Sequence, residues 1–424
     1  MDLTIHNAIH DKTLKPVNVG ISDGIIQVIS EDEIQPGKEA IDSEFAMLSP
    51  ALVEPHFHLE NAVLPEHVNK SGTLNEAIKI TEMIKDRLTP EDIFRRSSIA
   101  LQQAIFHGEQ WLRDHTDVDE VAKLELFNAV KTVKTAFKDV IDIEIVAFPQ
   151  FGLADNPESV DLVYEAMETG ADLVGGVPHR EKDMDKAARQ IEIAFDIAIA
   201  HDADIDMHVD ETDDPYWHTL ELLADKTIET GYQGRVTAGH CCAMAAWPEK
   251  LFQRVLPKVL KADINICTNT PVNLILQGRG EELPVRRGIP RVKDLLEAGV
   301  NVTCGQDDLQ NMFYPFGAMD GMAVANFVAH VAHLSSESQI LDAFDMPRYS
   351  AAKTLNINNY GLFVGARANL ILFHAVSAAD ALRRQPYRKH VIRDGKVLVR
   401  TEQKTTFHQD YSDLLGLKTS GRHV

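Results

Sequence analysis

The sequence predicts an α/β fold: a (β/α)8 TIM barrel that carries a small β-sandwich domain built from the N- and C-terminal segments. Through the middle of the chain, short runs rich in Val and Ile alternate with longer segments of helical period, which is typical of parallel strands linked by helices. Both ends of the chain instead show the alternating pattern of half-buried strands. The 424 residues suffice for one large barrel and a second, smaller unit.

Eight candidate strands give the predicted barrel its strand number. Helices are expected between them, for instance over Ser159–Thr169 and Pro290–Glu297, each ending near a glycine as helices often do. Eight β–α repeats in roughly 300 residues are typical of a TIM barrel. The candidate strands cover residues 46–59, 108–118, 141–150, 171–179, 203–211, 234–240, 262–270 and 299–308.

The two ends of the chain are expected to pair into one β domain. Their strand-like pieces are separated by turn signals, Ser-Asp-Gly near the start and Arg-Asp-Gly near the end. The predicted organisation assigns residues 1–47 and 363–408 to the β domain, 48–362 to the barrel and 409–424 to a C-terminal extension.

The formal net charge of −22 argues against nucleic acid or an anionic membrane as the main partner, because both would repel the protein. A small-molecule substrate that is neutral or cationic fits better. No apolar stretch reaches the ~20 residues of a membrane-spanning helix, and the N-terminus lacks the basic start of a signal peptide, so we expect a cytoplasmic protein. The four cysteines lack CxxC or disulfide-framework spacing and are expected to be buried thiols.

The stretch EPHFHLEN, residues 54–61, contains two histidines one residue apart. Residues i and i+2 of a strand point to the same side, so His56 and His58 would project together. Taken alone, the pair is explained as simply by two hydrogen-bonded structural histidines. Other candidate strands also end in ligand-type side chains, however, and in a TIM barrel these ends converge on one site. These side chains are His208, Glu211, His240, Asp307 and Asp308.

Three histidines and one aspartate would suit one divalent ion with an open position for water. The cation lowers the pKa of its bound water toward about 7, which makes hydroxide available as the nucleophile. Glu211, three residues after His208, is placed to move protons between the water and the leaving group, and His240 and Asp307 could complete the relay. The alternative for Glu211 is a solvated acid in the loop DETDD.

Several motifs then follow EPHFHLEN in a fixed order: IVAFPQFGL, DMHVDETDD, VTAGH, PVNLILQGR with RRGIPRVKDLLEAGVNV, and GQDD followed by YPFG. Together they resemble the amidohydrolase superfamily, specifically its bacterial cytosine deaminase branch. The resemblance runs from about residue 45 to 400, and it includes the segment NYGLFVGARANLILF, where such enzymes return from the barrel to the small β domain. It also implies a homo-oligomer, commonly a hexamer.

The resemblance implies roles for individual residues. Glu211 would protonate the ring nitrogen and shuttle a proton to the departing amine, while His240 would orient and help to deprotonate the attacking water. Gln150 would hydrogen-bond the amide edge of the ring, and Asp308 would lie beside the substrate. The implied ligands of one divalent metal, Fe²⁺ or Zn²⁺, are His56, His58, His208 and Asp307.

Two positions near the implied pocket depart from the family pattern. Gln306 stands where a histidine precedes the paired aspartates, and Phe313 stands where a tryptophan follows them. Phe313 still offers an aromatic wall for a flat heterocycle, worth about 0.5–1.5 kcal/mol beyond its area, but it leaves more room. We therefore expect both residues to act in substrate binding and to be the source of any change in substrate.

The predicted reaction is metal-dependent hydrolytic deamination of a cytosine-like nitrogen heterocycle, in which cytosine and water give uracil and ammonia. Isocytosine, 5-methylcytosine, creatinine or an s-triazine such as ammelide stay open as substrates, because specificity rests on contacts worth about 1–3 kcal/mol each. Hydrolysis of a cyclic amide is an alternative that two ions per chain would favour. A non-catalytic scaffold would show damage to the site, whereas every implied metal and acid–base position is present.

Overall fold

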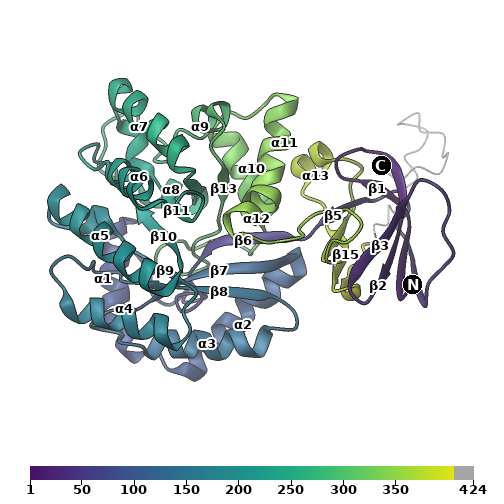
Figure 1. The fold of residues 1–424 in the computed structure, drawn as a ribbon, viewed down its shortest axis with the longest axis horizontal. Helices are drawn as coiled ribbons and strands as arrows, with labels where there is room; N and C mark the ends of the chain where they lie inside the picture. Colours follow the sequence, from purple (N-terminus) through teal and green to yellow (C-terminus); the bar gives the residue numbers. More distant parts are fainter. Residues whose placement is uncertain (405–424) are drawn as a thin grey trace.

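The computed structural model describes residues 1–404, which form a barrel and a separate sheet domain lying side by side (Figure 1). The predicted extension over residues 409–424 lies outside this range. Eight parallel strands alternate with helices in the barrel, as the sequence predicted. The strands are β6 (Leu52–Phe57), β7 (Glu109–Asp117), β8 (Asp142–Phe148), β9 (Leu173–Val174), β10 (Asp204–Val209), β11 (Val236–His240), β12 (Asn265–Thr268) and β13 (Val302–Cys304).

The first and last barrel strands meet at their carboxyl ends. The sheet runs in sequence order from β6 to β13, and a parallel bridge joins Phe57 to Asp307 just beyond β13. The Asp307 amide donates to the His56 carbonyl at 2.8 Å, and the His58 amide donates to the Asp307 carbonyl at 3.2 Å. This contact brings the first and last candidate ligand segments together.

Helices surround the barrel strands and begin and end where local chemistry favours it. The helix α2 is an example: Thr89 accepts a hydrogen bond from the Asp92 amide, Pro90 opens the first turn, and Gly108 ends the helix at φ 95°. The barrel helices are α1 (Leu74–Ile84), α2 (Pro90–His107), α3 (Glu125–Phe137), α4 (Pro157–Thr169), α5 (Met184–His201), α6 (Thr219–Thr230), α7 (Glu249–Ala262), α8 (Thr270–Leu276), α9 (Val292–Ala298), α10 (Gly321–Val331), α11 (Glu337–Asp345) and α12 (Ala351–Thr354).

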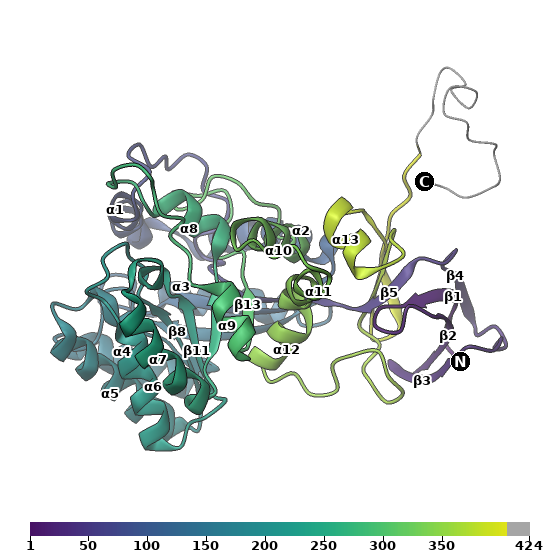
Figure 2. The same cartoon turned by 90° about the horizontal axis from the view of Figure 1, so that it is seen from above.

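Head and tail of the chain pair into one mixed sheet, which confirms the predicted small β domain. The sheet order is β16-β15-β14-β5-β1-β2-β3, with β4 paired to β1. Figure 2 shows this domain beside the barrel, with α13 (Ala378–Arg384) between them. The strands are β1 (Leu3–His10), β2 (Pro16–Ser22), β3 (Ile25–Ser30), β4 (Glu39–Asp42), β5 (Met47–Pro50), β14 (Leu370–Phe373), β15 (Arg388–Arg393) and β16 (Lys396–Arg400).

The prediction of one strand over residues 46–59 was wrong. The segment forms two strands, one in the small sheet domain and one in the barrel. Its first part, β5, pairs with β1 and β14 in the small sheet, whereas β6 pairs with β7 in the barrel. The hydrogen-bond partner changes from one sheet to the other between neighbouring residues. The Ala51 amide donates to the Asn369 carbonyl before β14, and the Leu52 amide donates to the Gly108 carbonyl before β7. Both parts are buried, so the apolar pattern does not mark the point where the chain crosses.

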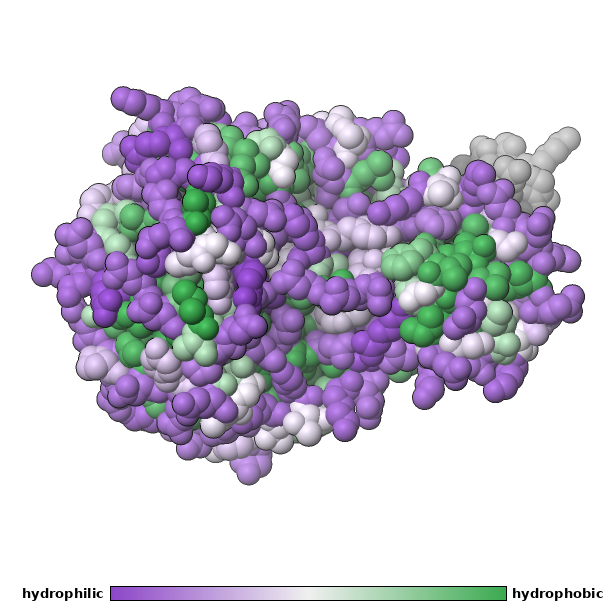
Figure 3. Space-filling view, in the orientation of Figure 1, coloured by the Kyte–Doolittle hydropathy of each residue, from purple (hydrophilic) through white to green (hydrophobic). Residues whose placement is uncertain are grey.

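The two units present different surfaces in the view of Figure 3. The visible face of the barrel is mostly hydrophilic, while a hydrophobic patch covers part of the small sheet domain. Among the helices of residues 1–404, none combines the length and apolar character needed to cross a membrane.

Candidate active site

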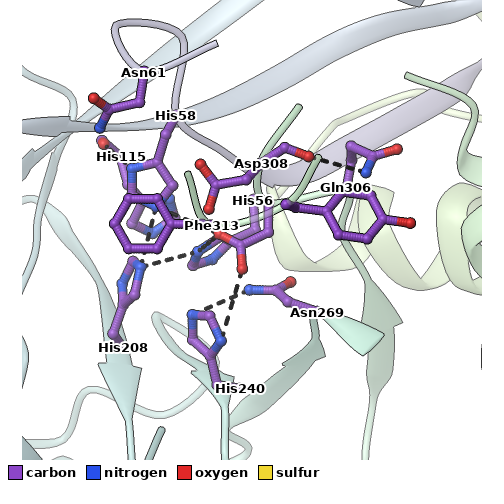
Figure 4. Close-up of polar contacts among 12 residues, drawn as sticks. His56, His58, Asn61, His115, His208, His240, Asn269, Gln306, Asp308 and Phe313 are labelled. Atoms are coloured by element: carbon purple, nitrogen blue, oxygen red, sulfur yellow. Dashed lines mark hydrogen bonds and ion pairs between the residues drawn. The ribbon is translucent and has the colours of Figure 1, made fainter. Parts of the chain in front are cut away.

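The ligand-type side chains predicted at the strand ends meet at the carboxyl end of the barrel (Figure 4). His56 lies in β6, His208 in β10, and His240 is the last residue of β11. Asp307 follows β13. One ligand atom from each of these four buried residues lies within 4.8 Å of the others.

His58 completes this cluster through two direct contacts. Its Nε2 lies 3.2 Å from His208 Nε2 and 3.5 Å from Asp307 Oδ1. His56 Nε2 makes the matching contacts, 3.3 Å from His208 Nε2 and 3.5 Å from Asp307 Oδ1. His56 and His58 therefore each place Nε2 against the same two atoms, His208 Nε2 and Asp307 Oδ1, and His240 belongs to the same group of ligand-type atoms.

The backbone at two of these positions adopts a conformation that L-residues seldom use. His240 has φ 66° and Asp307 has φ 67°, both in the left-handed region. Residues held in this region concentrate at functional sites, where the surrounding structure outweighs their strain. Glu54 supplies part of that support, because its carboxylate accepts hydrogen bonds from the His56 amide and from the Gln306 amide next to Asp307.

The charges of the cluster favour a bound cation. Burial and the neighbouring histidines hold the pKa of His56 and of His208 well below the ordinary value, so both rings are neutral and offer lone pairs. Burial acts to lower the pKa of His58, but Glu60 and Asp308 outweigh it and raise that pKa well above its ordinary value. Burial, then Asp308, raises the pKa of Asp307. Converging lone pairs beside an excess of carboxyl groups fit a divalent ion.

His240 and Glu211 form an acid–base pair beside the cluster. His240 Nδ1 lies 3.4 Å from Glu211 Oε1 and 3.9 Å from Asp307 Oδ2. Asn269 contacts the opposite ring nitrogen, Nε2, at 3.2 Å, and Asn273 lies 3.1 Å from Nδ1 and 3.4 Å from Glu211 Oε1. These contacts fix the imidazole with one edge toward the candidate metal ligands.

A cavity opens above the cluster, and all but one of the predicted substrate-binding residues line it. Gln150, Asp308 and Phe313 line it, together with His58, His208, Glu211 and His240. Gln306 does not line it: its Nε2 donates to the Asp308 carbonyl at 3.1 Å, and its amide donates to Glu54. Gln306 therefore reaches the cavity only through Asp308.

Two further histidines contact the ligands without facing the cavity centre. The ring of His115 stacks on that of His56 at 3.9 Å between centroids, and its Nε2 lies 3.1 Å from Asp206 Oδ1. His179 Nδ1 contacts the His208 carbonyl at 3.2 Å. Both arrangements hold ligand-bearing strands in place.

A buried lysine near the cavity was not predicted from the sequence. Lys85, just after α1, extends its Nζ to within 3.2 Å of Asp117 Oδ2 and also contacts the Asp119 carboxylate. The ammonium lies over the ring of Phe151, 4.1 Å from the centroid. Asp117 lines the cavity, so Lys85 fixes one of its walls.

Comparisons with known proteins agree with this architecture. The model described as "Amidohydrolase family" matches residues 114–399. The N-isopropylammelide isopropyl amidohydrolase of Pseudomonas sp. strain ADP is 30% identical over 412 residues, which cover 95% of this chain and 98% of that protein. The pterin deaminase of Rhizobium rhizogenes is 30% identical over 394 residues, 92% of this chain and 89% of that protein. This chain belongs to the amidohydrolase family.

A solved structure matches almost the full length of this chain. The 5-methylcytosine deaminase from Klebsiella pneumoniae, liganded with 5-fluorocytosine, is 33% identical and superposes with a TM-score of 0.92. The match covers 96% of this chain and 99% of that one. The resemblance identified in the sequence is confirmed, and the protein is an amidohydrolase-family hydrolase whose relatives act on carbon–nitrogen bonds.

Proposed function

We propose that this amidohydrolase deaminates a cytosine-like nitrogen heterocycle, converting cytosine and water to uracil and ammonia. The observation that carries the proposal is the juxtaposition of a buried carboxyl group, Glu211, with His240, and of His240 with His56, His208 and Asp307. Similarity to 5-methylcytosine deaminase supports this reaction class.

The residues that would hold the metal are His56, His58, His208 and Asp307, whose donor set suits either Fe²⁺ or Zn²⁺. When bound, such an ion supplies a water whose pKa falls toward about 7. His240 Nδ1, 3.9 Å from Asp307 Oδ2, is placed to orient that water and to take up its proton.

Glu211 is suited to deliver protons to the substrate. Burial, then the charge of Asp308, raises the pKa of Glu211 to about 8, so the carboxyl group carries a proton at neutral pH. It can protonate the ring nitrogen beside the attacked carbon as the electron pair moves onto that nitrogen. Ammonia leaves only after a second proton reaches the amine, and Glu211 regains one from His240 at 3.4 Å to supply it. As the C–N bond breaks, the proton left on the former water oxygen returns to Glu211, so the carbonyl forms and the carboxyl group is restored.

The remaining cavity residues would position the ring. Gln150 offers both a donor and an acceptor to an amide edge, and Phe313 offers an aromatic face. Asp308 is held by Asn311 and lies where it can accept a ring N–H or amine hydrogen. These groups recognise a flat ring with adjacent donor and acceptor atoms, which cytosine, isocytosine, 5-methylcytosine, creatinine and ammelide share.

The test is ammonia release from those five compounds by protein loaded with either Fe²⁺ or Zn²⁺. We expect cytosine or 5-methylcytosine to turn over best, and Glu211→Gln to lower kcat by about 100- to 10,000-fold while metal content stays stoichiometric. A Glu229→Gln variant, which changes an exposed acid on α6, is the matched control. Turnover of a cyclic amide in place of all five amines would replace this proposal with amide-ring hydrolysis.

A further inference from the structure

The guanidinium of Arg180 lines the active-site cavity without a partner. It ends the short turn Pro178–Arg180 that follows β9. Among the residues that the structure describes, its side chain makes neither a hydrogen bond nor an ion pair. An arginine carries five N–H donors and a permanent charge, and at this solvent-exposed edge of the cavity all of them are available to a ligand.

The turn that carries Arg180 is held firmly at several points. The Arg180 amide donates to the Val177 carbonyl at 3.0 Å, and the neighbouring His179 contacts the His208 carbonyl at 3.2 Å. The Glu181 carboxylate accepts hydrogen bonds from the Leu153 and Ala154 amides, both at 3.0 Å. These contacts fix the backbone from which the Arg180 side chain extends, between the inner cavity and the solvent.

Arg180 also lines an outer basin of about 540 Å³ that shares Glu211, Leu74 and Ile78 with the inner cavity. Besides Glu211, the acids of this basin are Asp213 and Asp214, and both accept hydrogen bonds from backbone amides: Asp213 Oδ2 from Gly278 at 2.7 Å, and Asp214 Oδ1 from Tyr216 at 2.9 Å. Neither is within ion-pair distance of Arg180. The basin is therefore a hollow lined by a cation that has no hydrogen-bond or ion-pair partner among residues 1–404.

Arg180 is exposed to solvent, although neighbouring atoms also surround part of its side chain. Burial lowers the pKa of the guanidinium, and the charges of Glu211, Glu82 and Asp117 act against that shift from beyond hydrogen-bonding distance. An anionic ligand whose two oxygens meet the planar guanidinium would gain charge-assisted hydrogen bonds at this exposed position. Cytosine itself carries no anionic group and would leave both Arg180 and the basin unused.

We propose that Arg180 is a specificity-determining residue that binds a carboxylate substituent on the heterocyclic substrate. The amine-bearing ring occupies the inner cavity, and its carboxylate points toward the outer basin, where the planar guanidinium can bind both oxygens. This inference rests on the proposed deamination, since it assigns the substrate class of the same site.

Paired substrates test the proposal: cytosine against 5-carboxycytosine, and pterin against pterin-6-carboxylate, with ammonia release as the readout. The metal-loaded wild type should prefer the acid in at least one pair. Arg180→Gln should lower kcat/KM for that acid by about 10- to 100-fold, mainly through KM, and leave its neutral parent almost unchanged. Arg180→Lys should restore part of the loss. Lys182→Gln removes a positive charge two residues away, outside both cavities, and should have no effect.

Product binding gives a readout that does not depend on turnover. Calorimetry should show that uracil-5-carboxylate, or the acid from the second pair, binds the metal-loaded wild type more tightly than its neutral parent, and that Arg180→Gln abolishes the difference. If Arg180→Gln lowered kcat/KM or affinity equally for the acid and its neutral parent, the proposal would be overturned. A wild type with no preference for acids would overturn it too. If no compound releases ammonia but the binding preference depends on Arg180, the deamination fails and the carboxylate site stands.

Discussion

His58 shows how a single residue is prepared for metal binding. Its Nδ1 contacts the His115 carbonyl at 2.7 Å, and because a carbonyl can only accept, the ring proton must lie on Nδ1. Nε2 then faces His208 and Asp307, and because nearby carboxyl groups raise the pKa of this ring, a metal ion would displace a proton from Nε2 to use its lone pair. A hydrogen bond of this kind orients a ligand before the ion arrives and raises its basicity.

Replacing His58 with Ala should therefore remove the metal together with the activity. The remaining cluster would lose one of four donors and the contacts that link His208 to Asp307. Metal content after dialysis and ammonia release measure the two losses. His201→Ala is the control, since His201 contacts only its own helix through Ile197 and the ring of Tyr164. Stoichiometric metal in the His58 variant would contradict the assignment of His58 as a ligand.

The ligands could be predicted from the sequence, because barrel strands end in ligand-type residues. The side chains that hold those ligands in place could not be predicted. Asn273 lies in the motif PVNLILQGR and Asn269 lies near the end of the predicted strand over residues 262–270, yet nothing in the sequence shows that their amides reach His240. Lys85 lies near a helix end, where a lysine is normally exposed. Partners separated by tens of residues become visible only when the topology brings them together, as with Lys85 and Asp117.

At the scale of secondary structure, the segment after β13 is packed too tightly for any side chain at Gly305. A Cβ there would lie 2.8 Å from Asn269 Oδ1, 2.9 Å from His56 Cβ and 3.0 Å from Glu54 Oε1. Each of these neighbours belongs to the site or supports it. The absence of a side chain at this position therefore allows β13 to approach β6 and to place Asp307.

Gly305→Ala should displace Asp307 and lower both metal retention and activity. We expect a loss of roughly 10- to 100-fold in metal affinity, as is typical when the groups that support metal ligands are disturbed. Titration with a chelator would measure the affinity. Gly280→Ala, where a Cβ meets nothing within 4 Å, should behave as wild type. Unchanged metal affinity in the Gly305 variant would show that the strand end tolerates the shift.

Strand periodicity predicted the eight barrel strands but not the division of residues 46–59. Each half of that segment is buried on all sides, so β5 and β6 share one apolar pattern. Which sheet a buried strand joins depends on partners such as Asn369 and Gly108, which lie far along the chain.

At the scale of the whole molecule, a buried ion pair joins the two units. Arg348, next to α12, donates to Asp11 Oδ2 at 2.9 Å and to Ser49 Oγ at 2.9 Å in the small sheet domain. It also donates to Asp345 Oδ1 at 2.8 Å on its own side. Burial acts to raise the pKa of Asp11, but Arg348 and His10 outweigh it, so this pKa lies below its ordinary value.

Asp11→Asn should therefore destabilise the protein in a pH-dependent way. A carboxyl group with a lowered folded-state pKa contributes stability above its unfolded pKa of about 3.9, and this stability is lost as pH falls through the folded value. We expect the free energy of unfolding to fall by roughly 1.5–3 kcal/mol at pH 7, and by less below pH 4. Urea unfolding at both pH values measures it. Asp32→Asn, an exposed acid of the same domain, is the control; equal losses at both pH values would argue against the ion pair.

The lysine bridge beneath α1 has a consequence for how molecules enter and leave. Leu74, Ile78 and Thr81 of α1 line the inner cavity, and Lys85 ties the end of this helix to Asp117 and Asp119 at the floor of the barrel mouth. Swinging the helix outward would leave two buried carboxylates without their cation, a change that costs about 3–5 kcal/mol. Opening of this wall is therefore disfavoured, and the basin beside Arg180, which shares Leu74, Ile78 and Glu211 with the inner cavity, is the side from which a substrate can approach.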